Sequence, residues 1–293
     1  MPPVLLLGPH PTDPALVGFA GYLAGLGVPH TLCSDLTRIG FSCAIRRDGN
    51  AHIRLDIPDL GSFAGDEIAV FVRHAWAFSR RTGTGPEARF IDSEYYSSWW
   101  TLCAALPHIV NRPGRWAWLH EREARARLAR HLPPEYWTST HEKLPARWDD
   151  VGSAEIHLED LVGFARCAFA QRDELAEWQA SGSPSGHLRA IFAPSSRYLL
   201  QICVAGEALT VLNEIDVDVD SAGHRTFMRG ITDQLQLIGL DFFGIAMVTD
   251  TIGRLYVTRI LSDPPYSWYS RHAAAIHERL YAALSRRGPP GNG

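Results

Sequence analysis

Residues 4–33 constrain the fold more than any other stretch of this 293-residue chain, because they predict a parallel β-sheet. The run VLLL at 4–7 predicts a buried strand, the polar loop GPHPTDP follows it, and residues 14–26 have the spacing of a helix. A second apolar strand is expected at 28–33. Strands joined by a helix are parallel neighbours in one sheet, since a parallel pair needs a crossover connection. The sequence therefore predicts an α/β fold that begins with a parallel sheet.

The remainder of residues 1–112 supplies further elements of the same domain. The segment FSCAIRRDGNAHIRLDI alternates around a turn at 48–50 and predicts a hairpin, and EIAVFVRHAWAF predicts another strand. A helix with a buried aromatic face is expected before Pro107, and HIVNRPG then returns as a short strand and turn. The residues that recur at helical spacing on that face are Tyr96, Trp99, Trp100 and Cys103.

The last third of the chain has the pattern of an antiparallel module. RYLLQICVAGEALTVLNEIDVDVD predicts a hairpin that turns at Gly206, and RGITDQLQLIGL predicts an amphipathic helix. A second hairpin over FFGIAMVTDTIGRLYVTRIL and a closing amphipathic helix follow. Residues 140–196 are the least regular, with one helix expected over RCAFAQRDELAEWQA. We predict an N-terminal α/β domain at 1–112, a reduced central region at 113–196, a C-terminal antiparallel α+β module at 197–287 and a disordered tail at 288–293.

Composition argues against several classes of protein. The formal net charge of −4 makes a nucleic-acid partner unexpected. The five cysteines form no C-x-x-C pair, which argues against a zinc site and against a disulfide framework. No apolar run reaches the ~18 residues that would span a bilayer, and the start MPPVLLLGPH lacks the basic segment of a signal peptide. We expect a cytoplasmic protein with no membrane partner.

Lysine is almost absent from the chain. Its 28 basic residues include a single lysine, Lys143, a bias that a GC-rich genome would explain in part. A nucleotide site that needs two compact ammonium groups on phosphates cannot be assembled from this chain. Arginine in their place would act with a different reach and geometry.

Three segments resemble the ATP-grasp ligases, especially those that modify ribosomal peptides. ARFIDSEYYSSWWTLCAALPHIVNRPGR resembles the end of their first domain, where an aromatic helix precedes a VNRP-like strand end. RYLLQICVAGEAL resembles their strand pair with a V-G-E turn, and GLDFFGIAMVTDTIGRLYVTRILSDPPYSWY resembles their terminal module. The segments follow in the right order, whereas the middle third of the chain matches poorly. The resemblance implies an ATP-grasp-like fold.

The resemblance also implies positions for magnesium ligands, and none of them carries a ligand here. In the family an acidic residue, a Glu and an Asn of the terminal module hold the ions that bridge the ATP phosphates. Carried over residue by residue, these positions fall at Ala246, Arg259 and Leu261. A hard cation requires oxygen ligands, and the charge of Arg259 would repel it by about 4 kcal/mol per charge at ~4 Å and an effective dielectric of ~20. We expect neither a metal nor a nucleotide cofactor.

The family further places two lysines and a glycine-rich flap in its central subdomain. Here that region offers only Lys143 and the turn SGSPSG. Peptide binding can outlast such a loss, and aromatic and arginine side chains are the types that line peptide-binding grooves. The candidate peptide-binding residues are Arg73, Tyr96, Trp100, Arg112, Arg115, Trp116, Trp118 and Arg259.

We therefore predict a peptide-binding pseudo-enzyme with no catalytic residues. By resemblance it would hold a ribosomal precursor peptide for a tailoring enzyme in natural-product biosynthesis. A homodimer is expected because two-fold dimers are the commonest oligomers. The alternative is an active enzyme on the precursor peptide: an ATP-independent cyclisation catalyst, or a ligase in which arginines replace the lysines. Binding of magnesium ATP separates the two interpretations.

Overall fold

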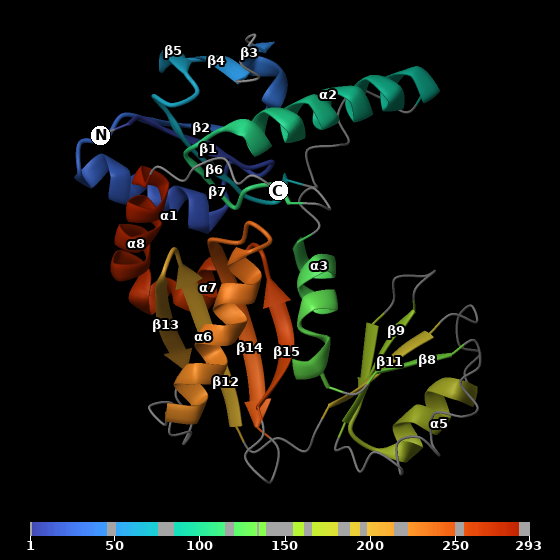
Figure 1. The fold of residues 1–293 in the computed structure, drawn as a ribbon. Coiled ribbons are helices and arrows are strands. Elements are labelled where there is room, and N and C mark those ends of the chain that lie inside the picture. Colours follow the sequence, from blue (N-terminus) through green and yellow to red (C-terminus); the bar gives the residue numbers. More distant parts are fainter. Residues whose placement is uncertain are drawn as a thin grey trace.

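The computed structural model describes residues 2–45, 51–75, 85–114, 120–133, 135–138, 155–160, 166–180, 188–193, 198–213, 222–249 and 255–286. Within these residues the strands form four sheets, three of them with four strands and one with three (Figure 1). No helix in the described part of the chain is long and apolar enough to cross a membrane.

The N-terminal sheet is parallel, as the sequence predicts. Its central strand pairs in parallel with a neighbour on each side, and all four of its residues are buried. Side chains alternate between the two faces of a strand, so the sheet has two apolar faces to cover. Helix α1 (Pro14–Gly25) packs on one face and helix α2 (Pro86–Ala105) on the other. The strand order is β2 (His30–Cys33), β1 (Val4–Leu7), β6 (Ala69–Val72) and β7 (Ile109–Val110).

A small antiparallel sheet covers the α2 side of the N-terminal sheet. The predicted hairpin is its pair β3 (Gly40–Ile45) and β4 (Ala51–Ile57), and the turn at 48–50 lies outside the described residues. A third strand, β5 (Gly61–Ala64), was not predicted. The short helix η1 (Leu36–Arg38) precedes this sheet.

The buried face of α2 is rotated around the helix relative to the face that the sequence predicts. Trp99 and Cys103 are buried, whereas Tyr96 and Trp100 are only half-buried. The buried stripe also includes Leu102 and Leu106, so it is centred to one side of the predicted face, and the two half-buried aromatic residues lie at its edge.

The C-terminal module is an antiparallel sheet of two hairpins, as predicted. Helix α6 (Ala222–Gln236) covers one face of this sheet and shares an apolar core with it. The strand order is β13 (Ala208–Asn213), β12 (Tyr198–Ala205), β14 (Phe242–Thr249) and β15 (Leu255–Leu261). The chain then forms α7 (Tyr266–Tyr269), η5 (Ser270–His272) and the closing helix α8 (Ala273–Ser285).

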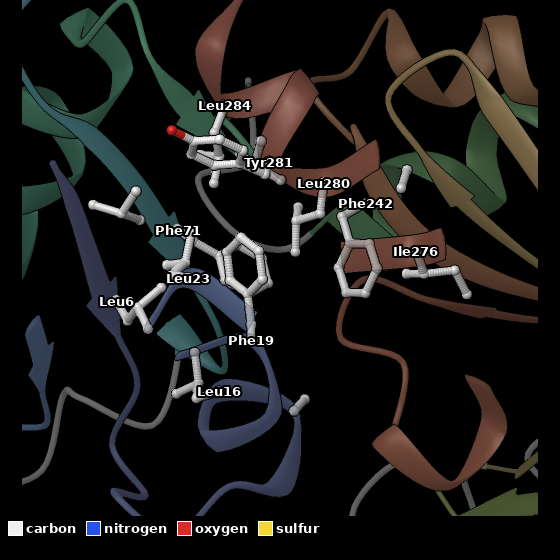
Figure 2. Packing of buried hydrophobic residues seen from close by; sticks show 14 of the residues in the cluster. Leu6, Leu16, Phe19, Leu23, Phe71, Phe242, Ile276, Leu280, Tyr281 and Leu284 are labelled. Carbon is white, nitrogen blue, oxygen red and sulfur yellow. The ribbon is translucent and has the colours of Figure 1, made fainter. Parts of the chain in front are cut away.

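Helix α8 joins the C-terminal module to the N-terminal sheet. It contacts α1, β6, β7 and β12, and its apolar side chains share one core cluster with those of α1 and β6. Figure 2 shows Ile276, Leu280 and Leu284 of α8 in this cluster. At its centre Phe71 makes edge-on contacts with Phe19 and Phe242, each with ring centroids 5.6 Å apart. The two ends of the chain are therefore held by one continuous core.

The central region contains more structure than the sequence predicts. The helix expected over 166–180 begins as strand β10 (Arg166–Phe169), and only α5 (Arg172–Ala180) is helical. The strands pair across long separations in sequence, which local patterns do not reveal. The sheet order is β10, β9 (Glu155–Asp160), β11 (Leu188–Ala193) and β8 (Glu135–Thr138). In Figure 1 this sheet lies beside α3 (His120–Arg127), which the short helix η3 (Ala129–His131) follows.

Two glycines on and after α6 give opposite predictions for substitution by alanine. Gly239 has φ +86°, and a Cβ there would lie 2.5 Å from the backbone oxygen of Arg112. We expect Gly239→Ala to lower the free energy of unfolding by about 2 kcal/mol or more. Gly230 lies inside α6, and a Cβ added there would meet nothing within 4 Å outside the backbone of the helix itself. Gly230→Ala should raise stability by about 0.5–1 kcal/mol. Urea denaturation measures both changes, and a shift in the same direction would contradict this account of the turn.

Candidate functional site

The carboxyl ends of β1 and β6 form the natural binding edge of the N-terminal sheet. After β1 the chain passes through α1 to β2, and after β6 it passes through α2 to β7 on the other side. The strand order therefore reverses between β1 and β6. In open parallel sheets, ligands bind at the carboxyl ends of the strands at such a reversal.

A buried ion pair lies at this edge. Asp13 caps the N-terminus of α1, where its Oδ1 accepts a hydrogen bond of 2.9 Å from the backbone N–H of Ala15. Arg73, which follows β6, donates from Nε to Asp13 Oδ2 at 2.7 Å. The side chain of Arg73 is 1% exposed, and that of Asp13 is 9% exposed. Removal of either partner would leave an uncompensated charge in the interior, a change that costs about 3–5 kcal/mol.

The surroundings of Asp13 favour its charged form. Burial alone would raise the pKa of this carboxyl, but the hydrogen bond from His74 and the charge of Arg73 outweigh it. The pKa of Asp13 therefore lies well below its ordinary value. The carboxylate stays ionised and holds Arg73 in place.

His74 lies between two carboxylates from distant parts of the chain. Its Nε2 is 3.6 Å from Asp13 Oδ2, and its Nδ1 is 3.9 Å from Asp263 Oδ2. His74 has φ +49°, a left-handed conformation that is uncommon for a residue other than glycine. Such strained residues gather at functional sites.

A cavity of about 520 Å³ opens at this cluster. Its walls combine charged, hydroxyl and apolar groups from the N-terminal domain and from the segment after β15. The lining residues are Asp13, Pro14, Arg73, His74, Asp263, Pro265, Tyr266, Ser267 and Ser270. A volume of this size can hold a side chain or a small ligand.

The amide of Asn111 fixes the position of the segment that carries Asp263. Its Nδ2 donates to the carbonyl oxygens of Phe242 and Ser262 at 2.8 and 2.9 Å. Its Oδ1 accepts from the backbone N–H groups of Asp241 and Phe242 at 3.0 and 2.8 Å. Asn111 is buried, so these four bonds tie the end of β7 to the start of β14 and the end of β15.

His120 supports the same junction from α3. It is buried, and its Nε2 lies 2.8 Å from the carbonyl oxygen of Arg112, to which it must donate. Burial lowers the pKa of His120, so the neutral ring is favoured. A void of about 10 Å³ separates His120, Asn111 and Asp263. This space is about the size of one water molecule.

The positions that would hold magnesium by resemblance lie together on the C-terminal sheet. Ala246 pairs with Arg259, and Gly244 pairs with Leu261, across β14 and β15. The side chains of directly paired residues project to the same face of a sheet. The ring of Trp268 lies over this face at Gly244, where a Cβ would meet it at 3.3 Å.

This face does not fit a magnesium ion. Ala246 is buried and has no polar side chain, Leu261 is half-buried, and Arg259 carries a fixed positive charge. None supplies the oxygen ligands that a hard cation requires. No cluster of three or more His, Cys, Asp or Glu suited to a metal occurs elsewhere in the described part of the chain.

The predicted peptide-binding residues lie in several places. Arg73 lines the cavity, but its guanidinium is bound to Asp13. Arg112 donates to the carbonyl oxygens of Ala104 and Pro107 at 2.6 and 3.2 Å, and so closes the end of α2. Arg259 is exposed on β15.

The predicted aromatic residues are placed only in part. Tyr96 and Trp100 are half-buried on α2, and burial raises the pKa of Tyr96 to about 12. Arg115, Trp116 and Trp118 lie outside the described residues. The role of the whole set in peptide binding stays a prediction.

Apart from Arg73, sequence reasoning missed the residues that build the cavity. Asp13 and Asn111 belong to the segments GPHPTDP and VNRP, but the sequence analysis predicted no role in a binding site for either residue. Asp13 follows a strand and precedes Pro14, the pattern of a helix N-cap at a binding edge. No local signal brings His74 and Asp263 together, because their separation in sequence is closed only by the tertiary fold.

Comparison with known proteins supports the predicted fold. No family profile matches the chain, and no curated protein matches it in sequence. Among solved structures, the chain is similar to a RiPP-associated ATP-grasp ligase from Chryseobacterium gregarium, solved with ADP and a leader and core peptide. The match has a TM-score of 0.65 and 13% identity, and covers 99% of this chain and 100% of the ligase.

Two further structures are similar over nearly their whole length. The macrocyclase MdnC from Microcystis aeruginosa MRC, bound with precursor peptide MdnA, gives a TM-score of 0.62 and 14% identity, over 95% of this chain and 99% of that one. The ATP-grasp ligase PsnB, complexed with minimal precursor, Mg and ADP, gives a TM-score of 0.66 and 13% identity, over 96% of this chain and 97% of that one.

The fold of this chain is therefore that of the ATP-grasp ligases associated with ribosomal peptides. The predicted resemblance and the predicted fold class are both confirmed at the level of the fold. The mixed architecture agrees, with a parallel N-terminal sheet and an antiparallel C-terminal sheet. The proposed bounds of the domains stay predictions.

The amide of Asn111 gives a test of how the site is held together. Asn111→Asp keeps the shape of the side chain but replaces the Nδ2 donor by an oxygen that faces two carbonyl groups. We expect the free energy of unfolding to fall by about 3 kcal/mol or more, since a buried charge and two unpaired acceptors result. Urea denaturation measures the loss. Gln234→Glu on the exposed side of α6 is the matched control and should change stability by less than about 0.5 kcal/mol. Equal effects of the two changes would contradict the account.

Proposed function

We propose that this chain binds a ribosomal precursor peptide without the help of magnesium ATP. The observation that carries the proposal is the face of β14 and β15, where Ala246, Arg259 and Leu261 stand at the positions of metal ligands. The bound peptides of the similar structures support the peptide as ligand, since the Chryseobacterium ligase, MdnC and PsnB were all solved with one.

The arrangement of the chain supports binding rather than ligation. A ligase must activate a carboxylate with ATP, and this requires cations on the phosphates. The arginine at 259 adds charge but no ligand, and its exposed side chain is available to a peptide carboxylate. In this proposal the chain holds the precursor for a tailoring enzyme of the same pathway in the cytoplasm.

A homodimer is the proposed assembly. Phe90 and Ile91 on the first half of α2 are 65% and 52% exposed. Two exposed apolar side chains at neighbouring positions form a surface that a second copy of the chain could cover. Sedimentation of the purified chain as a single 32.5 kDa species would exclude it.

The proposed function is tested by peptide binding with and without the nucleotide. The probe is the fluorescently labelled precursor peptide encoded beside the gene, followed by anisotropy. We expect binding of equal strength in magnesium ATP and in EDTA. Trp116→Ala should weaken binding about tenfold, the effect of ~1.4 kcal/mol. Trp99→Ala is the control for a core residue, because Trp99 is buried and its loss should cost about 3–5 kcal/mol of stability.

Three outcomes would contradict the proposal. The first is a peptide that does not bind to the folded chain. The second is binding that requires magnesium ATP. The third is a peptide that leaves the incubation with the mass of one water molecule removed, which would establish the alternative, an active cyclisation enzyme.

A further inference from the structure

We propose that the cavity at the carboxyl ends of β1 and β6 binds a lysine or arginine side chain of a peptide, with Asp263 as the carboxylate that receives the cation. This inference rests on the proposed function and deepens it, because it names the kind of side chain that the peptide presents to this chain.

The charges that line the cavity favour a cationic ligand. Two carboxylates, one guanidinium and the imidazole of His74 line the cavity. Arg73 is bound to Asp13 through Nε, and it also donates from Nη2 to the carbonyl oxygen of Pro264 at 3.2 Å. Asp13 in turn accepts bonds at both oxygens. The pair is therefore neutral, and the charge of Asp263 remains.

The Asp263 carboxylate has few hydrogen-bond partners among the described residues. Its side chain is 16% exposed, so it is largely removed from water. Among the described residues, its carboxylate accepts only a long bond of 3.4 Å from Ser262 Oγ, and His74 Nδ1 lies beyond hydrogen-bond distance at 3.9 Å. A half-desolvated carboxylate that faces a cavity gains most from a cationic donor, whose hydrogen bond is about twice as strong as a neutral one.

The remaining walls of the cavity combine apolar surface with hydroxyl groups. Pro14, Pro265 and Tyr266 present apolar surface beside Asp263, and Ser267 and Ser270 present hydroxyl oxygens. Lysine and arginine combine an aliphatic stem with a polar head, and they bury the stem against apolar surface. The prolines and the Tyr266 ring suit the stem, and the hydroxyls can accept the remaining N–H groups.

Arg73 supplies an independent observation at the same place. It is 1% exposed and lines the cavity, yet its Nη1 has no hydrogen-bond acceptor among the described residues. A buried donor without an acceptor is costly, so a partner is expected. A backbone carbonyl of the bound peptide is an acceptor of the required kind. In this proposal the side chain of the ligand binds Asp263, and its backbone supplies the acceptor for Arg73.

The test uses small amides as probes, so that it does not depend on the precursor peptide. Nα-acetyl-lysine amide and Nα-acetyl-arginine amide carry the cation, and Nα-acetyl-norleucine amide has the stem alone. Ligand-observed NMR with the full chain measures each dissociation constant. We expect the two cationic amides to bind at least tenfold more tightly than the norleucine amide, and Asp263→Asn to abolish that preference.

The matched control is Asp66→Asn. Asp66 is exposed on the turn before β6, at the opposite end of that strand from the cavity, so its loss should leave the preference unchanged. Melting temperatures of both variants establish that they fold. Equal binding of the lysine and norleucine amides, absence of lysine binding, or a preference that survives in Asp263→Asn would overturn the inference.

The inference and the proposed function can fail separately. A chain that prefers the lysine amide but does not bind the precursor peptide would contradict the proposed function alone. A chain that binds the precursor equally well as wild type and as Asp263→Asn, with no preference among the amides, would contradict this inference alone.

Discussion

The four hydrogen bonds of the Asn111 amide are the interaction on which the candidate site depends. They join the end of a strand in the N-terminal sheet to two strands of the C-terminal sheet. The bond from Arg73 to the carbonyl oxygen of Pro264 reinforces the same junction. Together they bring Asp263 to the edge where Asp13 and His74 lie, and the core shared by α1, β6 and α8 makes that junction rigid.

The cavity and the face of β14 and β15 that corresponds by resemblance to a metal site are built from different residues. The face of β14 and β15 lies on the C-terminal sheet, and Ala246, Arg259 and Leu261 occupy the positions that the resemblance assigns to metal ligands. The cavity at the N-terminal edge depends on other features. These are the buried ion pair of Arg73 and Asp13, the positive φ of His74, and the hydrogen bonds of the Asn111 amide to the backbone.

The sequence predicts the outer parts of the chain well and the middle poorly. The run VLLL, the helix after it and the two C-terminal hairpins are local patterns, and each forms the expected element. The central sheet was missed because β8 pairs with β11 across a long separation in sequence. The candidate site was missed for the same reason: Asp13, His74 and Asp263 come from three segments, and no spacing within one segment joins them. Ala246, Arg259 and Leu261 were assigned from the resemblance, and the structure places them on one face of β14 and β15, while the absence of a bound metal stays a prediction.

The most direct test of the central claim is a calorimetric titration of magnesium ADP and magnesium ATP into the wild-type chain. Because Ala246, Arg259 and Leu261 carry no side-chain oxygen, we expect no cation to bridge the phosphates to this face of the protein. The account predicts only heats of dilution for both nucleotides, the same as in EDTA. Saturable binding of one nucleotide per chain, of micromolar strength and abolished by EDTA, would contradict it.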